Sequence, residues 1–336
     1  MRYFLGYVGK SFERFCCGLL GGNGTKSALV VPMLDFEKAK KSSADQVFAW
    51  TDTEGYEPAL RRAVKFLDSK SRRFGIEETI TFGNIEQIKS VLGASEFLPI
   101  SIEASNLRLI KTEEEIKSIK DAARKLTHVY KAFPEIIRKG KTESEIGIEI
   151  VKLMYEQKLE PDEPPLVQSG PNSAIPHSTI SPRVLQKGDM IVVDSSCPNI
   201  EGYYADFTRT FVLGKPNEKQ KEVYEVVKRA EAAGVEESES RKSAQEVDRK
   251  TRSIIAKAGY GKYFVHRTGH GLGLEVHEAP YIREGNLENM ENGIVFTVEP
   301  GIYLPGKFGV RIEDNVVIEN GKAKNLTTLS HELIEL

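Results

Sequence analysis

The sequence predicts an α+β protein of two domains, a small α/β domain over residues 1–107 and a larger α+β domain over residues 108–336. Three observations lead to this prediction. The length of 336 residues is about that of two ordinary domains. Short apolar segments alternate with amphipathic helices up to about residue 107, as is typical of an α/β unit. A helix start signal then opens a second region of helices and strands.

Composition limits the function classes before any motif is considered. The chain has 47 Lys and Arg against 49 Asp and Glu, so its charge gives no reason to expect nucleic acid or an anionic membrane as a partner. No apolar run approaches the roughly 20 residues of a spanning helix, and the N-terminus lacks the pattern of a secretory signal. The 3 cysteines are too few for a disulfide framework. We therefore expect a cytoplasmic globular protein with reduced thiols.

The first domain is expected to alternate strands with helices. The apolar run Ser27–Val31 predicts a buried strand, and residues 56–70 and 84–92 carry apolar side chains at helical spacing. The glycines within residues 21–24 favour a turn between strands, because glycine adopts positive φ without strain. No glycine-rich phosphate-binding fingerprint follows a strand here, so a nucleotide site is not expected.

The second domain opens on a capping box, in which Thr112 caps a long helix and Glu115 occupies the third helical position. Three further helices are expected, over residues 144–157, 217–238 and 243–258. Residues 161–182 contain six of the 15 prolines, which predicts an irregular loop or a linker. This segment also carries His177, and polar groups in a long loop indicate a functional rim.

Two aspartates are the first candidate metal ligands. Met190–Asp194 predicts a buried strand that ends in a carboxylate, and Asp206 lies twelve residues later in another strand-like segment. Asn199 and Gly202 suit a hairpin turn, which would place the two aspartates side by side. Adjacent carboxylates repel each other unless a proton or a cation lies between them. A lone aspartate at a strand end is usually a cap or a surface charge, but two at this spacing favour a metal site.

A histidine cluster follows. His266, His270 and His277, three of the 6 histidines, lie within twelve residues and among glycines that let the backbone approach a site closely. A single buried histidine is more often a satisfied core residue than a ligand. A cluster beside a glycine turn favours metal, because imidazole is the commonest neutral metal ligand. The spacing is not that of HExxH, so a zincin is not indicated.

Two glutamates complete the candidates. Glu299 and Glu313 each end or interrupt an apolar strand pattern, where glutamate is rare unless it is paired or bound to metal. Taken alone, Arg311 and Glu313 could equally form a surface ion pair along one strand face.

The candidates together supply four carboxylates and one imidazole, from Asp194, Asp206, His270, Glu299 and Glu313. Two divalent cations would cancel the four carboxylate charges, and shared carboxylates could hold both ions. An oxygen-rich set with one histidine favours Mn(II), Co(II) or Fe(II), with Mn or Co first, and leaves Zn(II) open.

The ordered motifs around these five residues resemble those of the pita-bread metallopeptidases, which include methionine aminopeptidases, Xaa-Pro aminopeptidases and prolidases. The resemblance begins at Tyr3-Phe4-Leu5-Gly6 and is most specific over residues 166–320. It implies a creatinase/aminopeptidase-like catalytic domain over residues 108–336, after a creatinase-type, ribonuclease H-like domain over residues 1–107. Members usually begin with a helix and a strand before the segment like Tyr3–Gly6, so about one βα unit is expected to be missing.

The resemblance also implies the role of each ligand. Asp206 and Glu313 would bridge two metal ions. Asp194 would bind one ion, and His270 with Glu299 would bind the other.

Roles in catalysis and substrate binding come from the same resemblance. Glu299 would double as a proton shuttle. His177 and His277 would bind the substrate and stabilise the tetrahedral intermediate. His266 and Arg311 would be further substrate-binding residues.

Within the family, the details favour the proline-specific branch. Arg311-Ile312-Glu313-Asp314-Asn315 resembles Xaa-Pro peptidases, whereas methionine aminopeptidases typically show Glu-His-Thr there. The separate N-terminal domain indicates the same branch. The complete ligand set argues against creatinase and against the non-catalytic members that act as metal-free binding modules.

The resemblance implies small peptide substrates with proline in the second position. We expect an Xaa-Pro dipeptidase (prolidase) first, an Xaa-Pro aminopeptidase on longer peptides second, and a methionine aminopeptidase third. Tyr281 stands where some prolidases carry an arginine for the dipeptide carboxylate, which Arg283 or Arg311 could replace. Members are commonly dimers, so a homodimer is expected.

Overall fold

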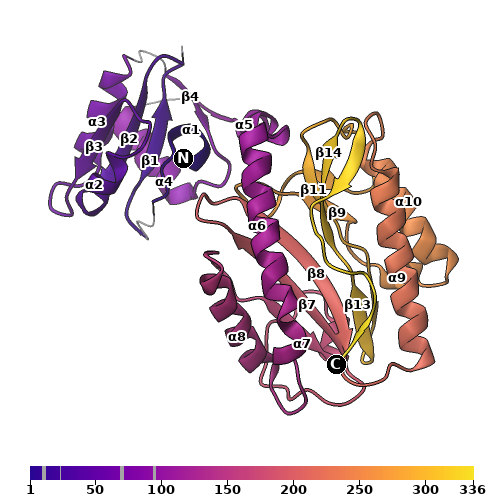
Figure 1. Cartoon of the computed structure of the whole chain (residues 1–336). Coiled ribbons are helices and arrows are strands. Elements are labelled where there is room, and N and C mark those ends of the chain that lie inside the picture. The colour runs from indigo at the N-terminus through magenta and orange to yellow at the C-terminus, as the bar shows by residue number, and fades with distance from the viewer. Residues whose placement is uncertain (10–12, 23, 69–71, 94–95) are drawn as a thin grey trace. The chain divides into compact units, whose positions relative to one another are not determined.

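The chain forms two compact units, Met1–Ala104 and Ser105–Leu336, in a computed structural model (Figure 1). It describes residues 1–336 except 10–12, 23, 69–71 and 94–95. The boundary expected after residue 107 falls within helix α5 (Ser101–Leu109), three residues beyond the division of the contacts.

The first unit is an α/β domain. In chain order its elements are α1 (Arg2–Leu5), β1 (Cys17–Leu20), β2 (Ser27–Pro32), η1 (Met33–Asp35), α2 (Phe36–Ala39), β3 (Gln46–Trp50), α3 (Glu57–Phe66), β4 (Arg73–Ile76), α4 (Phe82–Leu92) and β5 (Glu96–Pro99). Strand β2 lies between antiparallel β1 and parallel β3, and β4 pairs with β5 in parallel. The apolar face of α3 packs into the core over β2, as the helical spacing predicts.

The predicted elements of this unit are present with small differences in extent. The strand expected over Ser27–Val31 is β2, and the glycine turn connects β1 to β2, with Gly24 at a φ of 68°. Asn23 of that turn lies outside the described residues. Helix α3 ends at Phe66 with Leu67 as its C-cap, and residues 69–70, where the predicted helix ends, lie outside the described residues.

The second unit is larger and contains the remaining elements. These are α6 (Glu113–Lys131), α7 (Phe133–Ile136), α8 (Glu143–Glu156), β6 (Leu166–Ser169), η2 (Gly170–Ala174), β7 (Met190–Pro198), β8 (Tyr204–Val212), α9 (Glu218–Glu237), α10 (Ala244–Lys257), η3 (Gly261–Tyr263), β9 (Gly269–Gly271), β10 (Glu278–Ile282), β11 (Val295–Val298), β12 (Gly301–Leu304), β13 (Phe308–Arg311), β14 (Asp314–Glu319), β15 (Lys322–Asn325) and β16 (Ile334–Glu335).

Strands occupy the middle of this unit and helices its outside, the arrangement of the pita-bread fold (Figure 1). The sheets have the orders β16-β8-β7-β6 and β10-β9-β11-β14-β15, with β12 and β13 as a separate pair. Helices α6 and α8 pack with β7 and β8 in one apolar core. Helices α9 and α10 pack against the other strands in two further cores.

The long helices begin where side-chain capping predicts. The Thr112 hydroxyl oxygen accepts a hydrogen bond from the Glu115 backbone N–H, and the Glu115 carboxylate accepts one from the Thr112 backbone N–H. The same reciprocal box starts α8, α9 and α10 at Thr142, Asn217 and Ser243. Each box satisfies backbone N–H groups that a helix start leaves unpaired.

Two expectations for this unit are wrong. The proline-rich segment over residues 161–182 is not wholly irregular, since it contains β6, whose residues pair antiparallel with β7. Asp194 does not end its strand, because β7 continues to Pro198. The hairpin with β8 supplies ladder partners up to the pair Pro198–Tyr204, so the strand has no reason to stop earlier.

Candidate metal centre

The two aspartates come from the β7–β8 hairpin. Asp194 pairs with Thr208 in the ladder, and Asp206 pairs with Ser196. Side chains two residues apart on a strand share a face, so Asp194 and Asp206 are diagonal neighbours on one face of the sheet. The predicted proximity is present, and the hairpin turn lies at residues 199–203, where Asn199 and Gly202 predicted it.

The two glutamates are fixed by backbone contacts. Glu313 lies between β13 and β14, and its N–H donates to the Thr208 carbonyl at 3.1 Å, while the Thr208 hydroxyl donates to its carboxylate at 2.7 Å. Glu299 follows β11, and its N–H donates to the Thr268 carbonyl at 2.7 Å. Both glutamates are thereby held next to the strands that carry the other candidates.

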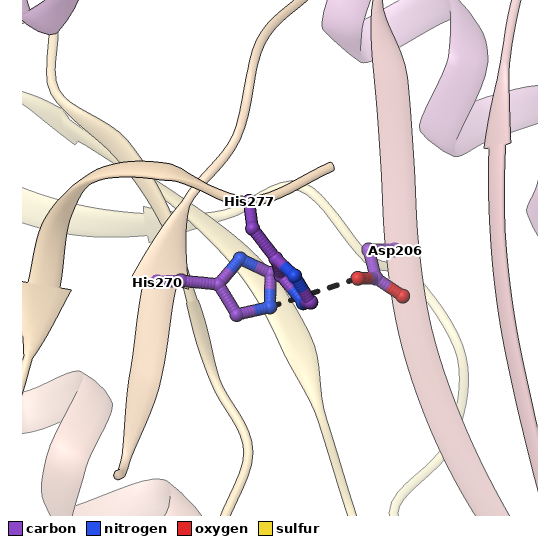
Figure 2. Close-up of side chains that lie close together, drawn as sticks. All are labelled: Asp206, His270 and His277. Carbon is purple, nitrogen blue, oxygen red and sulfur yellow. Dashed lines mark ion pairs between the residues drawn. The ribbon is translucent and has the colours of Figure 1, made fainter. Parts of the chain in front are cut away.

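His270 on β9 is buried and faces the carboxylates. Its Nδ1 lies 3.1 Å from the carbonyl oxygen of Gly271, which can only accept, so Nδ1 carries the proton and Nε2 is free to act as a ligand. Nε2 lies 3.4 Å from Glu299 Oε1 and 3.7 Å from Asp206 Oδ2. Figure 2 shows His270 opposite Asp206, with the ring of His277 beside it.

These residues form overlapping groups whose ligand atoms lie within 4.8 Å of one another. One group is Asp194, Asp206 and Glu313, and another is His270, Glu299 and Glu313. Glu313 belongs to both, which suits a shared ligand. Asp206 also groups with His270 and His277.

The electrostatics of the cluster suit cations. Burial, followed by the charges of nearby carboxylates, raises the pKa values of Asp206 and Glu313 well above their usual range. Burial likewise raises the pKa of Glu299 to about 8. Four carboxylates crowded in a buried site are poorly compensated by the protein alone, so the donor set fits divalent metal ions.

Arg311 compensates part of the negative charge of these carboxylates. Its guanidinium donates to Asp194 Oδ2 at 2.7 Å, to the Tyr303 hydroxyl at 2.9 Å and to the Thr208 hydroxyl at 3.1 Å. Arg311 is buried, so the alternative of a surface ion pair with Glu313 is wrong. Its guanidinium is engaged by the protein on three sides, which leaves little of it for a substrate.

The three other histidines named from the sequence differ in their surroundings. His277, just before β10, is exposed, and its ring lies 4.1 Å from that of His270 in an edge-to-face arrangement. His177 is exposed in the loop after η2. His266 has both ring nitrogens engaged, Nε2 with the Tyr303 hydroxyl at 2.8 Å and Nδ1 with the Arg267 carbonyl at 2.7 Å. Burial lowers the pKa of His266 to about 4, so its ring is neutral.

Gln168 is a supporting residue that the sequence analysis missed. It is buried on β6, and its Nε2 lies 3.0, 3.2 and 2.9 Å from the carbonyl oxygens of Ile175, Pro176 and Ser178. These carbonyls flank His177, so one amide group holds the loop that presents this histidine. A glutamine directly after the apolar pair Leu166–Val167 was the available signal.

Asn315 is a second missed residue. Its side-chain oxygen accepts from the Asp206 N–H at 3.0 Å, and its Nδ2 donates to the Asp206 carbonyl. The amide thus binds both backbone groups of Asp206 and ties β8 to β14. Asn315 was visible in the sequence only as part of the motif around Glu313.

A separate buried cluster lies behind Glu313. Arg209 donates to the Glu313 carbonyl at 2.7 Å and to Asp314 Oδ1 at 2.6 Å. His331 Nε2 lies 2.6 Å from Asp314 Oδ2, and Glu231 lies next to both. Both oxygens of Asp314 are already bound, so this cluster positions the Glu313 backbone rather than offering ligands.

Comparison with known proteins now identifies the family. Residues 117–320 match the model of metallopeptidase family M24, and residues 1–110 match that of the creatinase/prolidase N-terminal domain. The chain belongs to metallopeptidase family M24. Membership implies that divalent metal ions take part, in agreement with the acidic and histidine groups described above.

Relatives and solved structures extend over most of the chain. An Xaa-Pro dipeptidase of Pyrococcus horikoshii is 38% identical over 93% of this chain and 86% of its own length. A prolidase structure from Thermococcus sibiricus has a TM-score of 0.93 at 37% identity, covering 100% of this chain and 91% of that one. An X-Pro aminopeptidase structure from Thermotoga maritima has a TM-score of 0.88 at 32% identity, with 100% and 91% covered. No helix in the described part of the chain is long and apolar enough to cross a membrane.

Proposed function

We propose that this protein is an Xaa-Pro dipeptidase that hydrolyses the peptide bond before proline with the help of two divalent metal ions. The observation that carries the proposal is the set of overlapping ligand groups with Glu313 in common, in a chain of this family. The names of the prolidase and dipeptidase relatives support the substrate class.

The residues divide into two ligand groups. Asp194, Asp206 and Glu313 would hold one ion, and His270, Glu299 and Glu313 the other, with Asp206 as a further bridge. When bound, the ions would polarise the scissile carbonyl and activate water. The oxygen-rich ligand set favours Mn or Co.

The remaining groups position the substrate and move protons. Glu299 is buried beside the centre, and a carboxyl whose pKa lies near 8 can hold or release a proton close to neutral pH. His277 is exposed next to His270, where its ring can donate to the developing oxyanion. His177 would contact the substrate from the opposite loop. His266 would act on Arg311 through Tyr303, because its own nitrogens are engaged.

A homodimer and a cytoplasmic location complete the proposal. The near-neutral charge and the few cysteines support the location. An Xaa-Pro aminopeptidase is the second candidate, because the Thermotoga maritima structure of that name has closely the same fold.

Length preference separates these activities. We expect kcat/KM for Leu-Pro to exceed that for Leu-Pro extended by two residues, with no turnover of Met-Gly. A tetrapeptide cleaved ten times better than the dipeptide would support the aminopeptidase. Turnover of Met-Gly alone would indicate a methionine aminopeptidase.

A further inference from the structure

A dipeptidase must neutralise a carboxylate one residue beyond the scissile bond, close to a centre that is rich in carboxylates. An arginine is well suited to this task, because its planar fork matches a carboxylate bidentately. Arg311 is buried and engaged by Asp194, Tyr303 and Thr208. Arg283 is exposed, and its Nη1 donates to the Glu284 carbonyl at 3.1 Å. Neither is a good receptor for the substrate.

Arg267 has the properties that these arginines lack. It is half-buried, and its guanidinium has no ion-pair or hydrogen-bond partner among the residues that the structure describes. Its guanidinium carbon lies 4.6 Å from the centroid of the Tyr281 ring, which is a cation–π contact. The charge of Arg267 acts on the Glu299 carboxyl of the candidate metal centre without a direct ion pair, so the hydrogen-bond donors of this partly desolvated cation are available to an anionic ligand.

The strand pairing places Arg267 beside the metal centre. Tyr281 on β10 is the ladder partner of His270 on β9, and the Thr268 N–H donates to the Ile282 carbonyl at 2.9 Å. Arg267 precedes Thr268, so its side chain can reach the Tyr281 ring across this pair. The charge of Arg267 acts on His277, His270 and Glu299, so the guanidinium lies within electrostatic range of the candidate metal centre.

The contact with Tyr281 also restrains the guanidinium. A cation–π contact uses the positive charge of arginine and the face of the ring, so the N–H donors of the guanidinium need no partner on the tyrosine. The aromatic ring thus holds the cation in place without consuming its hydrogen bonds.

We propose that Arg267, held against Tyr281, binds the C-terminal carboxylate of an Xaa-Pro dipeptide and restricts the enzyme to short substrates. This inference rests on the proposed function. It assigns the length preference to a contact between an arginine just before β9 and a tyrosine on β10.

The test compares Leu-Pro with its amide, Leu-Pro-NH2, which has the same scissile bond without the terminal charge. The wild-type enzyme should prefer the acid. Arg267→Gln should lower kcat/KM for Leu-Pro by about 30-fold or more, mainly through KM, and change that for the amide by less than about 3-fold. Arg267→Lys should recover part of the loss. Arg249→Gln, at an exposed arginine paired with Glu284, is the matched control and should keep the wild-type ratio.

Tyr281→Leu provides a variant that leaves Arg267 in place. Loss of the cation–π contact should lower the acid-to-amide preference by about 5-fold. The inference is overturned if both substrates are cleaved and Arg267→Gln keeps the wild-type ratio, or if Arg283→Gln abolishes the preference instead. A wild-type enzyme that cleaves neither substrate would overturn the proposed function, and the inference with it.

Discussion

Glu313 and Asp314 are neighbours in the chain, yet they belong to two buried acidic clusters that are neutralised differently. Asp314 has internal partners: although burial alone would raise its pKa, Arg209 and His331 lower it below the usual value. Glu313 faces the other carboxylates, and burial together with Asp206 and Glu299 raises its pKa. The structural cluster is thus neutralised by its own cations, whereas in the candidate metal centre Arg311 compensates part of the negative charge and metal ions would compensate the rest.

The largest effect is expected from removing a shared ligand. Asp206→Ala or Glu313→Ala deletes a carboxylate that we place on both ions, so both metals should be lost and activity should fall below detection. Elemental analysis of the purified variants measures the metal content. Asp121→Ala, on the surface of α6, is the control and should keep both ions and full activity. Two ions still bound to Asp206→Ala would contradict the bridging role.

The metal-free protein should become less stable as the pH rises. Asp206, Glu299 and Glu313 have raised pKa values in the folded state, so between about pH 6.5 and 8 the folded chain holds protons that the unfolded chain has released. Each such group contributes up to about 1.4 kcal/mol of lost stability per pH unit. Below about pH 6.5 the dependence is opposed by three histidines whose pKa values are lowered in the folded state, His266, His270 and His277.

Denaturation at several pH values, with and without metal, measures this dependence. Added Mn(II) should raise the free energy of unfolding more at pH 8 than at pH 5.5, because metal binds the deprotonated ligands. An apo protein whose stability is flat from about pH 6.5 to 8 would contradict the assigned shifts.

Removing the internal cation of the other cluster tests its structural role. Arg209→Met leaves Asp314 buried without its main partner and should lower the free energy of unfolding by about 3–5 kcal/mol. The matched control is Arg249→Met at an exposed ion pair, which should cost less than about 1 kcal/mol. If urea denaturation gives the same loss in free energy of unfolding for both variants, the Asp314 cluster contributes no more to stability than a surface ion pair.

His277 should affect the reaction without affecting metal binding. It lies beside His270 but is exposed, and we place it as an oxyanion donor. His277→Ala should keep both ions while kcat falls by about 100-fold. Loss of an ion from this variant, by elemental analysis, would show that His277 is a ligand.

The sequence predicted the candidate ligands better than the groups that hold them. The proximity of Asp194 and Asp206 could be predicted because one hairpin connects them, and hairpin pairing is a local property of the sequence. The partners of these groups come from distant segments: Arg311 binds Asp194 across 117 positions and Asn315 binds Asp206 across 109. Strand periodicity carries no information about such pairs. For the same reason the sequence could not decide whether Arg311 lies on the surface, because its burial depends on how β13 packs against β7.

The smallest effect is expected at Gln168, which acts through His177. Gln168→Glu keeps the size of the side chain but removes the N–H donors that bind the carbonyls of Ile175, Pro176 and Ser178. Because His177 contacts substrate in our proposal, KM for Leu-Pro should rise by about 10-fold with metal content unchanged. A double-mutant cycle with His177→Ala measures how much of the effect of Gln168 on KM depends on His177. If Gln168 only holds His177 in position, its replacement should cost little once that histidine is absent, whereas additive losses would assign Gln168 a role in the stability of β6 alone.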